Sequence, residues 1–534
     1  MATATLAMAF SANAQLTWAS RDGQYNRKSP LPTQIVTDTT LNAWRGERIS
    51  ALALLNADAD MLATASLKGN LKGEAHFNDF VLTNNYQSCG TPPADLETWE
   101  VADIIDSTTS AANLAAGETR PVWVTIEVPR NTKPGTYTNT LTVDGRQLTL
   151  HINVQDKTLP KPTEDNFYLD LWQQPYSVSR YHNVEPWSKE HFALLEPYAK
   201  MLARAGQNNI SAILFFEPWG AQSNDLFLPM VNTVRKTDGT WNYDYTIFDR
   251  WVEFMTKHGV GPDIECFTMI PWDMSFRYFD EATNDYAFLK TTTGAKEYAD
   301  LWSSFLKSFL KHVDKKGWTE RVVIMMDERS SEDMANAIRV VNSVSPQLKV
   351  SLAGNYHPEI IDRLYACSLN WGQPYPPGKV AERRANGQIS AIYTCCGSPK
   401  PNLFTNNMPA DAAWLPLYVK TTGHDGYLHW SWMNWTDDPL HDSRFKFFAP
   451  GDTYFIYPEG RSSVRFERLI EGIQLSEKAR ILREKFIADG NTQALDELNS
   501  AFIPIAAGWN DNHSSTALQV ANATTTIDHL STIK

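Results

Sequence analysis

Eight short apolar runs, separated by longer amphipathic stretches, constrain the fold of this 534-residue chain more than any other feature. Near-continuous apolar runs of this length are typical of parallel strands that are buried on both faces. The intervening stretches carry apolar residues three and four positions apart, as in Tyr298, Trp302, Phe305 and Phe309, which indicates helices. The runs are FYLDLW from Phe167, ISAILFF from Ile210, DIECFTMI from Asp263, VVIMM from Val322, LKVSLAG from Leu348, YACSLNW from Tyr365, ISAIYTCC from Ile389 and GYLHWSW from Gly426.

Eight alternations of strand and helix predict a (β/α)8 barrel over residues 159–475, of the TIM type, with a few long loops. A doubly wound open sheet is the alternative layout. Because no G-x-G-x-x-G motif follows the first run, a dinucleotide-binding fold has no support. From Ser462 the pattern is helical again and predicts one long helix packed against the barrel. A second helix is expected over 514–533, so residues 476–534 form a predicted C-terminal helical extension.

Residues 15–158 show a different pattern of apolar and polar positions, which predicts an all-β domain. VWVTIEV (122–128) and LTLHINV (148–154) alternate apolar and polar positions, which is the period of half-buried strands. Pro134-Gly135 supplies a turn between them. Strands and turns at these short intervals indicate a β-sandwich. The following segment TLPKPTED (158–165) has two prolines and no apolar periodicity, so it reads as a linker.

The net charge of the chain limits its binding partners, and its first residues indicate its location. A formal net charge of -13 disfavours nucleic acid and anionic membrane surfaces, and there is no run of about 18 apolar residues. Residues 1–14 read as a signal peptide without its basic region, ending in the cleavage pattern Ala12-Asn13-Ala14, with a disordered N-terminus as the alternative. We therefore expect an exported protein, periplasmic or extracellular.

The five cysteines are Cys89, Cys266, Cys367, Cys395 and Cys396. Their number is small and odd, so no disulfide framework is expected. The adjacent pair Cys395 and Cys396 lacks the spaced partners of a zinc site, and the cysteines are interpreted as buried thiols.

Polar and aromatic residues recur where the predicted strands end, and in a barrel this edge carries the active site. Core packing would explain one or two of the tryptophans, but 18 in the chain and six or more at strand ends favour a carbohydrate cleft. The residues at these ends are Asp170, Trp172, Gln173, Glu217, Trp219, Trp272, Asp273, Asp327, Glu328, Asn370, Trp371, Tyr393, Trp430, Trp432, Asn434 and Trp435.

The sharpest local signal is VVIMMDERSS (322–331), in which five apolar residues lead directly into Asp327 and Glu328. Two unpaired charges cannot remain in a strand buried on both faces, so these carboxylates belong at the open end. The alternative is a surface acid pair at the start of a helix capped by Ser330 or Ser331. Adjacent carboxylates suit two atoms on one side of a sugar: one protonates the glycosidic oxygen and the other holds a 2-acetamido group. These roles require a raised pKa for the acid and a low pKa for the orienting carboxylate.

At these residues the chain resembles glycoside hydrolase family 123, whose members are retaining β-N-acetylgalactosaminidases that act through an oxazolinium intermediate. The resemblance covers nearly the whole chain after residue 14 and includes the N-terminal β-sandwich. Besides the Asp327-Glu328 pair, it rests on DLWQQPYSVSRYHNV after the first strand, DGYLHWSWMNWTDDPLHDSRF in the eighth, GDTYFIYPEGRSSVRFERLIEGIQ before the C-terminal helix and VPRNTKPGTYTNTLTV in the sandwich.

The resemblance implies roles for individual residues. Asp327 would orient the acetamido nitrogen, Glu328 would be the general acid and then the general base, and Tyr393 would bind the acetamido oxygen. A sugar subsite lined by aromatic and amide side chains would contain Trp172, Trp272, Asn370, Trp371, Trp430, Trp432 and Asn434. No cofactor or metal is expected, because His424, His429 and His441 lack the spacing of a ligand set.

The predicted function is therefore an exo-acting glycosidase that releases terminal β-linked N-acetylgalactosamine (GalNAc) from glycans or glycolipids. Another retaining β-N-acetylhexosaminidase is one alternative. A non-catalytic carbohydrate-binding protein that keeps the cleft is a second, although the presence of both carboxylates speaks against it.

Overall fold

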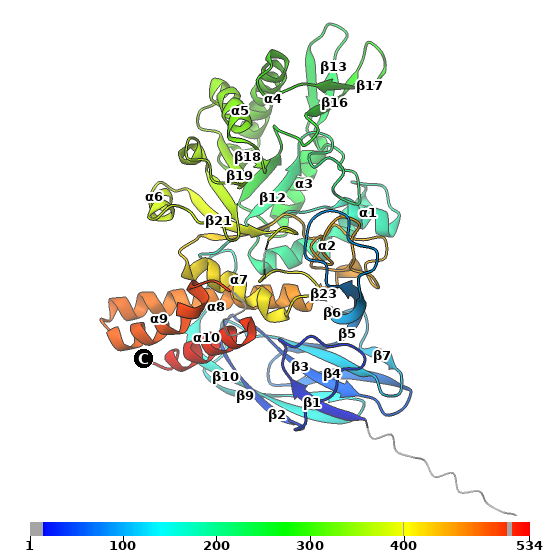
Figure 1. The fold of residues 1–534 in the computed structure, drawn as a ribbon, viewed down its shortest axis with the longest axis vertical. Coiled ribbons are helices and arrows are strands. Elements are labelled where there is room, and N and C mark those ends of the chain that lie inside the picture. Colours follow the sequence, from blue (N-terminus) through cyan, green and yellow to red (C-terminus); the bar gives the residue numbers. More distant parts are fainter. Residues whose placement is uncertain (1–13, 399, 510–514, 534) are drawn as a thin grey trace, which may run out of the picture.

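The computed structural model describes residues 14–398, 400–509 and 515–533. Figure 1 shows a β-rich N-terminal domain, blue to cyan, at one end of the long axis and a barrel of strands and helices, mainly green to yellow, at the other. The C-terminal helices, orange to red, lie between them on one side. The predicted signal peptide falls outside the described residues, except for Ala14.

The N-terminal domain is a sandwich of two sheets, as predicted. Val122, Val124 and Ile126 of one sheet share a core with Leu148 and Leu150 of the other. In spatial order, one sheet contains β1 (Gln15–Ala19), β3 (Arg48–Asn56), β8 (Thr119–Glu127), β5 (Gly73–Asn84), β6 (Thr98–Ile105) and β23 (Ser462–Ser463). The other contains β2 (Asp38–Arg45), β10 (Arg146–Thr158), β9 (Gly135–Val143), β4 (Met61–Gly69) and β7 (Ala111–Leu114).

Strand β8 is more buried than its alternating sequence indicated. Trp123 points away from the sandwich core yet is fully buried, in a cluster with Leu52, Leu54 and Val464. Val464 is the first residue of α8 (Val464–Ala488), so the start of this helix covers the outer face of the sheet. The N-terminal domain is therefore packed against the rest of the chain.

The barrel contains all eight predicted strands. Neighbouring strands pair in parallel, β11 pairs with β22, and an isolated bridge between Leu169 and Gln207 joins β11 to the start of β12. This closure excludes the alternative of an open sheet. The strands are β11 (Tyr168–Leu171), β12 (Asn209–Ile213), β15 (Asp263–Phe267), β18 (Val322–Asp327), β19 (Lys349–Gly354), β20 (Ala366–Asn370), β21 (Ile389–Thr394) and β22 (Gly426–His429).

Helices connect most of the barrel strands. They are α1 (Tyr176–His182), α2 (Lys189–Ala205), α3 (Thr246–Lys257), α4 (Lys296–Lys315), α5 (Ser331–Val344), α6 (Lys379–Ala385) and α7 (Pro409–Thr421). Between β19 and β20, where every residue is described, a 3-10 turn (Ile361–Arg363) stands in place of a helix.

Two of the expected long loops instead form a small additional sheet. Its strands are β14 (Trp241–Asp244), β13 (Asn232–Arg235), β16 (Ser275–Asp280) and β17 (Asp285–Lys290). They have four to six residues each and are half-buried or exposed at every position except Thr233 and Phe276, so they lack the apolar pattern that identified the barrel strands.

The C-terminal region contains α8, α9 (Thr492–Ala506) and α10 (Thr516–Leu530), one helix more than predicted. Helix α8 runs without a break through the expected boundary at residue 475. At its start, the buried Arg465 forms an ion pair with Asp103 of β6 at 2.9 Å and also donates to the backbone oxygen of Gly451 at 2.9 Å. One guanidinium thus joins the sandwich, the barrel and α8.

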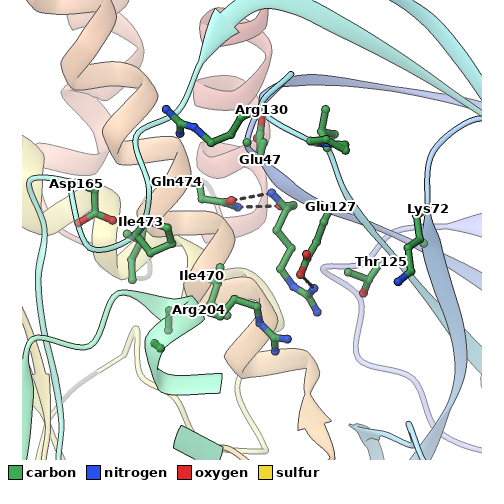
Figure 2. A pocket seen from close by; sticks show the side chains of 18 of the residues that line it. Glu47, Lys72, Thr125, Glu127, Arg130, Asp165, Arg204, Ile470, Ile473 and Gln474 are labelled. Atoms are coloured by element: carbon green, nitrogen blue, oxygen red, sulfur yellow. Dashed lines mark hydrogen bonds and ion pairs between the residues drawn. The ribbon is translucent and has the colours of Figure 1, made fainter. Parts of the chain in front are cut away.

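A cavity of about 680 Å³ lies at this junction of domains (Figure 2). Arg48 donates to Glu127 at 2.8 Å, and its backbone exchanges two hydrogen bonds with the Gln474 side chain of α8, each at 2.8 Å. The Arg48–Glu127 pair lies within the sandwich, whereas the Arg48–Gln474 hydrogen bonds cross the domain interface, and the lining contains none of the residues that the sequence marked as catalytic.

The cysteines correct one prediction. Cys89, in the loop after β5, forms a disulfide with Cys396, in the loop after β21, so these two are not thiols. Cys266 and Cys367 are buried thiols, and Cys395 is a partly buried thiol. Two cysteines 307 positions apart leave no local spacing signal, which is why the count alone misled.

Inside the barrel, Asp170 of β11 and Glu265 of β15 are buried together and share a hydrogen bond. Burial raises the pKa of Asp170 to about 6, and burial together with the Asp170 charge raises that of Glu265. The folded protein therefore holds a proton that the unfolded chain releases above its ordinary carboxyl pKa. The stability from this pair is complete in acid and is lost as the pH rises through about 6.

We expect Glu265→Gln to reduce this pH dependence, because glutamine keeps a hydrogen bond to Asp170 without a titrating proton. Between pH 5 and pH 8 the wild-type melting temperature should fall more than that of the variant. At pH 8 the variant should gain about 2–4 °C relative to its offset at pH 5. Exposed Glu185→Gln is the matched control. Parallel curves for all three proteins would contradict a buried proton on this pair.

Candidate active site

A cavity of about 580 Å³ lies at the carboxyl ends of the barrel strands. Residues at or just after strand ends reach it, among them Trp172 after β11, Trp272 after β15, Asp327 in β18, Tyr393 in β21 and Leu428 in β22. The cavity therefore occupies the edge of the barrel where parallel strands place catalytic groups.

The backbone turns sharply between the two catalytic candidates. Asp327 ends β18, and Glu328 has a left-handed conformation with φ of 49° while its amide donates to Ala353 O at 2.7 Å. Gly354 makes room for this turn, because a Cβ there would lie 3.2 Å from the Glu328 Cα. Left-handed non-glycine residues are uncommon and cluster at functional sites. This turn brings both carboxylates to the cavity.

Neither carboxylate caps the following helix. The cap of α5 is Ser330, whose hydroxyl accepts a hydrogen bond from the Asp333 amide. Asp327 Oδ2 instead accepts from the Trp272 indole at 3.3 Å, and Glu328 Oε1 accepts from the Tyr393 hydroxyl at 2.7 Å. The alternative of a purely helix-capping acid pair therefore does not fit these contacts.

Burial, and next the charge of Glu328, raise the pKa of Asp327 to about 7. This differs from the expectation of a low pKa for the orienting carboxylate, because Asp327 lies deeper, beneath the indoles, while Glu328 is exposed to the cavity. The Asp327 carboxyl therefore keeps its proton up to about neutral pH.

Tyr393 and Arg329 complete the surroundings of the pair. Burial and the Glu328 charge raise the pKa of Tyr393, so its hydroxyl stays protonated and acts as a donor. The sequence had assigned that hydroxyl to a substrate oxygen, whereas its observed acceptor is Glu328. The Arg329 guanidinium lies 4.3 Å from the centre of the Trp272 ring and opposes the rise in the pKa of Asp327. Arg329 was not singled out from the sequence, although it directly follows the pair.

Three predicted tryptophans line the cavity: Trp172, Trp272 and Trp430. The Trp430 indole donates to Asp452 Oδ2 at 3.0 Å, and His429 Nε2 lies 3.4 Å from Asp452 Oδ1. This buried contact fixes the orientation of the Trp430 ring. His429 therefore has a structural partner, and among the described residues no group of three or more His, Cys, Asp or Glu could hold a metal ion.

Three other predicted subsite residues lie away from the cavity, which corrects the sequence interpretation. Trp371 packs against Trp414 and Tyr418 of α7, with ring centres 5.9 and 4.9 Å apart. Trp432 is fully buried against Tyr198 and Phe466. Asn434 is buried and accepts from the Asn224 amide at 2.9 Å. Side chains near a strand end can face the helices as well as the cavity, and sequence position does not distinguish these directions.

Asn370 lies behind the cavity wall. It is not among the lining residues, but its amide group donates to the Cys395 sulfur at 3.7 Å and its oxygen accepts from Ser398 at 3.1 Å. Asn370 thus supports the Cys395 wall of the cavity.

The sequence missed the lining residues that come from loops: Cys89, Gly90, Gly220, Ala221, Gln222, Cys395, Cys396, Phe447 and Phe448. Glu217, which closes the second apolar run, does not line the cavity, and its Oε2 accepts from the Ala221 amide at 2.9 Å. It therefore shapes the 220–222 wall. Loop residues carry no periodic signal, so spacing could not have identified them.

Comparison with known proteins identifies the family. The family model described as "Glycoside hydrolase 123, catalytic domain" matches residues 172–482, and the one described as "Glycoside hydrolase 123 N-terminal domain" matches residues 18–145. This chain belongs to glycoside hydrolase family 123. The family makes it a glycosidase, and the matched catalytic segment contains Asp327, Glu328 and Tyr393. No curated protein matches this chain in sequence.

A solved structure from the same family agrees with this fold. A family 123 glycoside hydrolase from Clostridium perfringens, reported for glycolipid glycan hydrolysis, is 24% identical with a TM-score of 0.86, covering 97% of this chain and 98% of that chain. A GH5 xyloglucanase from Bacteroides ovatus is 8% identical with a TM-score of 0.29 and coverage of 86% and 100%. A GH2 beta-galacturonidase from Eisenbergiella tayi is 9% identical with a TM-score of 0.28 and coverage of 80% and 69%. Only the first likeness is close enough to support the arrangement of both domains.

None of the helices in the described part of the chain combines the length and apolarity that crossing a membrane requires.

Proposed function

We propose that this glycosidase is a retaining exo-β-N-acetylgalactosaminidase in which the acetamido group of the substrate is the nucleophile. One observation carries the proposal: among the described residues that line the cavity, the only carboxylates are Asp327 and Glu328, which are adjacent in sequence. Ordinary retaining enzymes place two carboxyl groups about 5–5.5 Å apart on opposite sides of the bond, and inverting enzymes about 6.5–9.5 Å apart. No second carboxylate lies across this cavity among those residues.

In this mechanism the substrate supplies the missing nucleophile. The acetamido oxygen attacks the anomeric carbon, the bond to the leaving group breaks, and a cyclic oxazolinium ion forms. Glu328 protonates the departing oxygen and later removes a proton from the water that opens the ring. Asp327 accepts the acetamido N–H and stabilises the positive charge that develops there.

The raised pKa of Asp327 fits these roles. Approach of the acetamido N–H favours the ionised form of Asp327, so the proton that Asp327 keeps near neutral pH becomes available to the neighbouring Glu328, where the leaving group needs it. Tyr393 keeps its own proton and can donate to Glu328, as in the structure, or to the acetamido oxygen of a bound sugar. Trp172, Trp272 and Trp430 supply aromatic faces for the sugar ring.

The proposed substrate is a glycan or glycolipid with terminal β-GalNAc. The relative from Clostridium perfringens, described as acting in glycolipid glycan hydrolysis, supports a glycolipid head group. Hydrolysis of chromogenic β-GalNAc, β-GlcNAc and β-galactose substrates tests the proposal. Preference for β-GalNAc is expected, whereas preference for β-GlcNAc would indicate another hexosaminidase. Turnover of the β-galactose substrate, which has no acetamido group, would contradict the mechanism.

An acetamido nucleophile also predicts tight inhibition by GalNAc-thiazoline, a stable analogue of the cyclic intermediate. Analogues of this kind bind about 10²-fold or more tightly than substrate, so its inhibition constant should lie at least that far below the dissociation constant of free GalNAc. Competitive inhibition assays measure both values. Equal affinities would indicate instead a covalent glycosyl-enzyme on a carboxylate.

We infer that the protein is exported. The disulfide between Cys89 and Cys396 supports this location, because disulfides persist in oxidising compartments outside the cytosol. Alkylation of the protein as isolated from its host, followed by mass spectrometry, should show two of the five cysteines protected. Recovery in the cytosolic fraction with all five alkylated would overturn the inference.

A further inference from the structure

The cavity has a floor and an outer wall of different origin. The floor comes from barrel strand ends, including Asp327, Tyr393 and Leu428. The outer wall comes from three segments outside the barrel strands. Cys89 and Gly90 lie on the loop after β5 of the N-terminal sandwich, Cys396 lies on the loop after β21, and Phe447 and Phe448 lie on the segment that follows β22. We call Cys89, Gly90, Cys396, Phe447 and Phe448 the stapled wall.

The sandwich loop is fixed to the barrel by several bonds. The disulfide joins Cys89 to Cys396, directly after the loop residue Cys395 and close to Tyr393 of β21. Asn406 donates to the backbone oxygen of Asn84 at 2.6 Å and to that of Tyr86 at 3.2 Å. The N-terminal domain thereby contributes permanent surface to the catalytic cavity.

The wall is apolar and uncharged. Phe447 is 38% exposed, so its ring is available to a ligand, and Phe448 packs on Trp430 with ring centres 5.0 Å apart. Lys446 Nζ lies 5.3 Å from the centre of the Phe447 ring, so a cation stands beside the wall although no wall residue is charged. The C–H face of a sugar can pack on an aromatic ring such as that of Phe447.

We propose that the stapled wall is the subsite for the sugar on the leaving-group side of the cleaved bond. The inference rests on the proposed function. An exo-acting enzyme holds the terminal sugar at the floor beside Asp327 and Glu328. The remainder of the glycan must then leave past the outer wall, where Phe447 presents its ring.

The first test replaces the exposed ring. Phe447→Ala should raise KM for a neutral oligosaccharide with terminal β-GalNAc about tenfold, which corresponds to the loss of a single well-placed aromatic contact. The turnover number should change much less. Inhibition by GalNAc-thiazoline, which has no group beyond the cleaved bond, should stay within about twofold of wild type. Phe288→Ala is the matched control, since Phe288 is 50% exposed on the additional sheet and does not line the cavity.

The second test removes the disulfide in Cys89→Ser/Cys396→Ser. We expect the same selective rise in KM for the oligosaccharide, while Cys367→Ser, which changes a buried thiol outside the cavity, should leave it unchanged.

The outcomes separate this inference from the proposed function. Failure of the wild type to bind GalNAc-thiazoline would count against the proposed function. Calorimetric binding of the oligosaccharide to wild type, Phe447→Ala and Phe288→Ala would then test the role of the stapled wall independently of catalysis. If Phe447→Ala left the KM or affinity for the oligosaccharide unchanged, the stapled wall would not be a sugar subsite. If the variant lost affinity for the oligosaccharide and the thiazoline equally, the subsite would not lie on the leaving-group side of the cleaved bond.

Discussion

Glu328→Gln should slow the hydrolysis of natural glycans about 10²–10⁴-fold, the usual contribution of a general acid. Sugar leaving groups depart poorly as anions and need the proton that Glu328 supplies. Nitrophenolate departs without protonation, so a nitrophenyl glycoside should lose much less. Glutamine keeps the hydrogen bond from Tyr393 and therefore the shape of the site. The measurement is kcat/KM for both substrate types in wild type and variant.

Exposed Glu332→Gln, in the first turn of α5, is the matched control because it removes the same charge outside the cavity. It should retain near wild-type rates on both substrates. Equal losses on glycan and nitrophenyl substrates in Glu328→Gln would show that Glu328 is not the acid. If Asp327→Asn instead slowed the glycan more than the nitrophenyl substrate, Asp327 would be the general acid and Glu328 would orient the acetamido group.

The barrel could be predicted because its strands are buried on both faces, and this burial demands continuous apolar runs such as VVIMM. The additional sheet could not, because its short, exposed strands need no such pattern. Helix α9 was missed for a related reason: it is exposed over much of its surface, and a proline lies inside it. The barrel strands could thus be located because burial on both faces gives each of them a continuous apolar run.

The position of Asp327 and Glu328 was predictable because two charges directly after a buried strand have one physically acceptable place, the open end. The direction in which a side chain near a strand end points could not be predicted from the sequence. Trp430 and Trp432 are two positions apart near one strand end, yet Trp430 lines the cavity and Trp432 is buried against Phe466. The stapled wall depends on Cys89 meeting Cys396 across 307 positions, a contact that only the packing of the two domains creates.

Asp327→Asn should lower the turnover number by at least one to two orders of magnitude. Asparagine keeps the shape of the side chain but removes the charge that stabilises the oxazolinium ion, and a charge-assisted hydrogen bond of this kind contributes about 1.5–3 kcal/mol. Affinity for intact substrate should change much less, because the acetamido nitrogen is neutral before reaction. A merely structural carboxylate would give the reverse pattern, with a lower melting temperature and near-normal turnover.

The pH profile supplies a readout that a structural role would not move. With the pKa of Asp327 raised to about 7, this carboxyl keeps its proton below that pH and loses it above, so kcat/KM should fall as the pH rises through about 7. In Asp327→Asn this titrating group is gone, so the residual activity should no longer fall near pH 7. An alkaline fall that stays at the wild-type position would show that Asp327 does not hold the proton on which this mechanism depends.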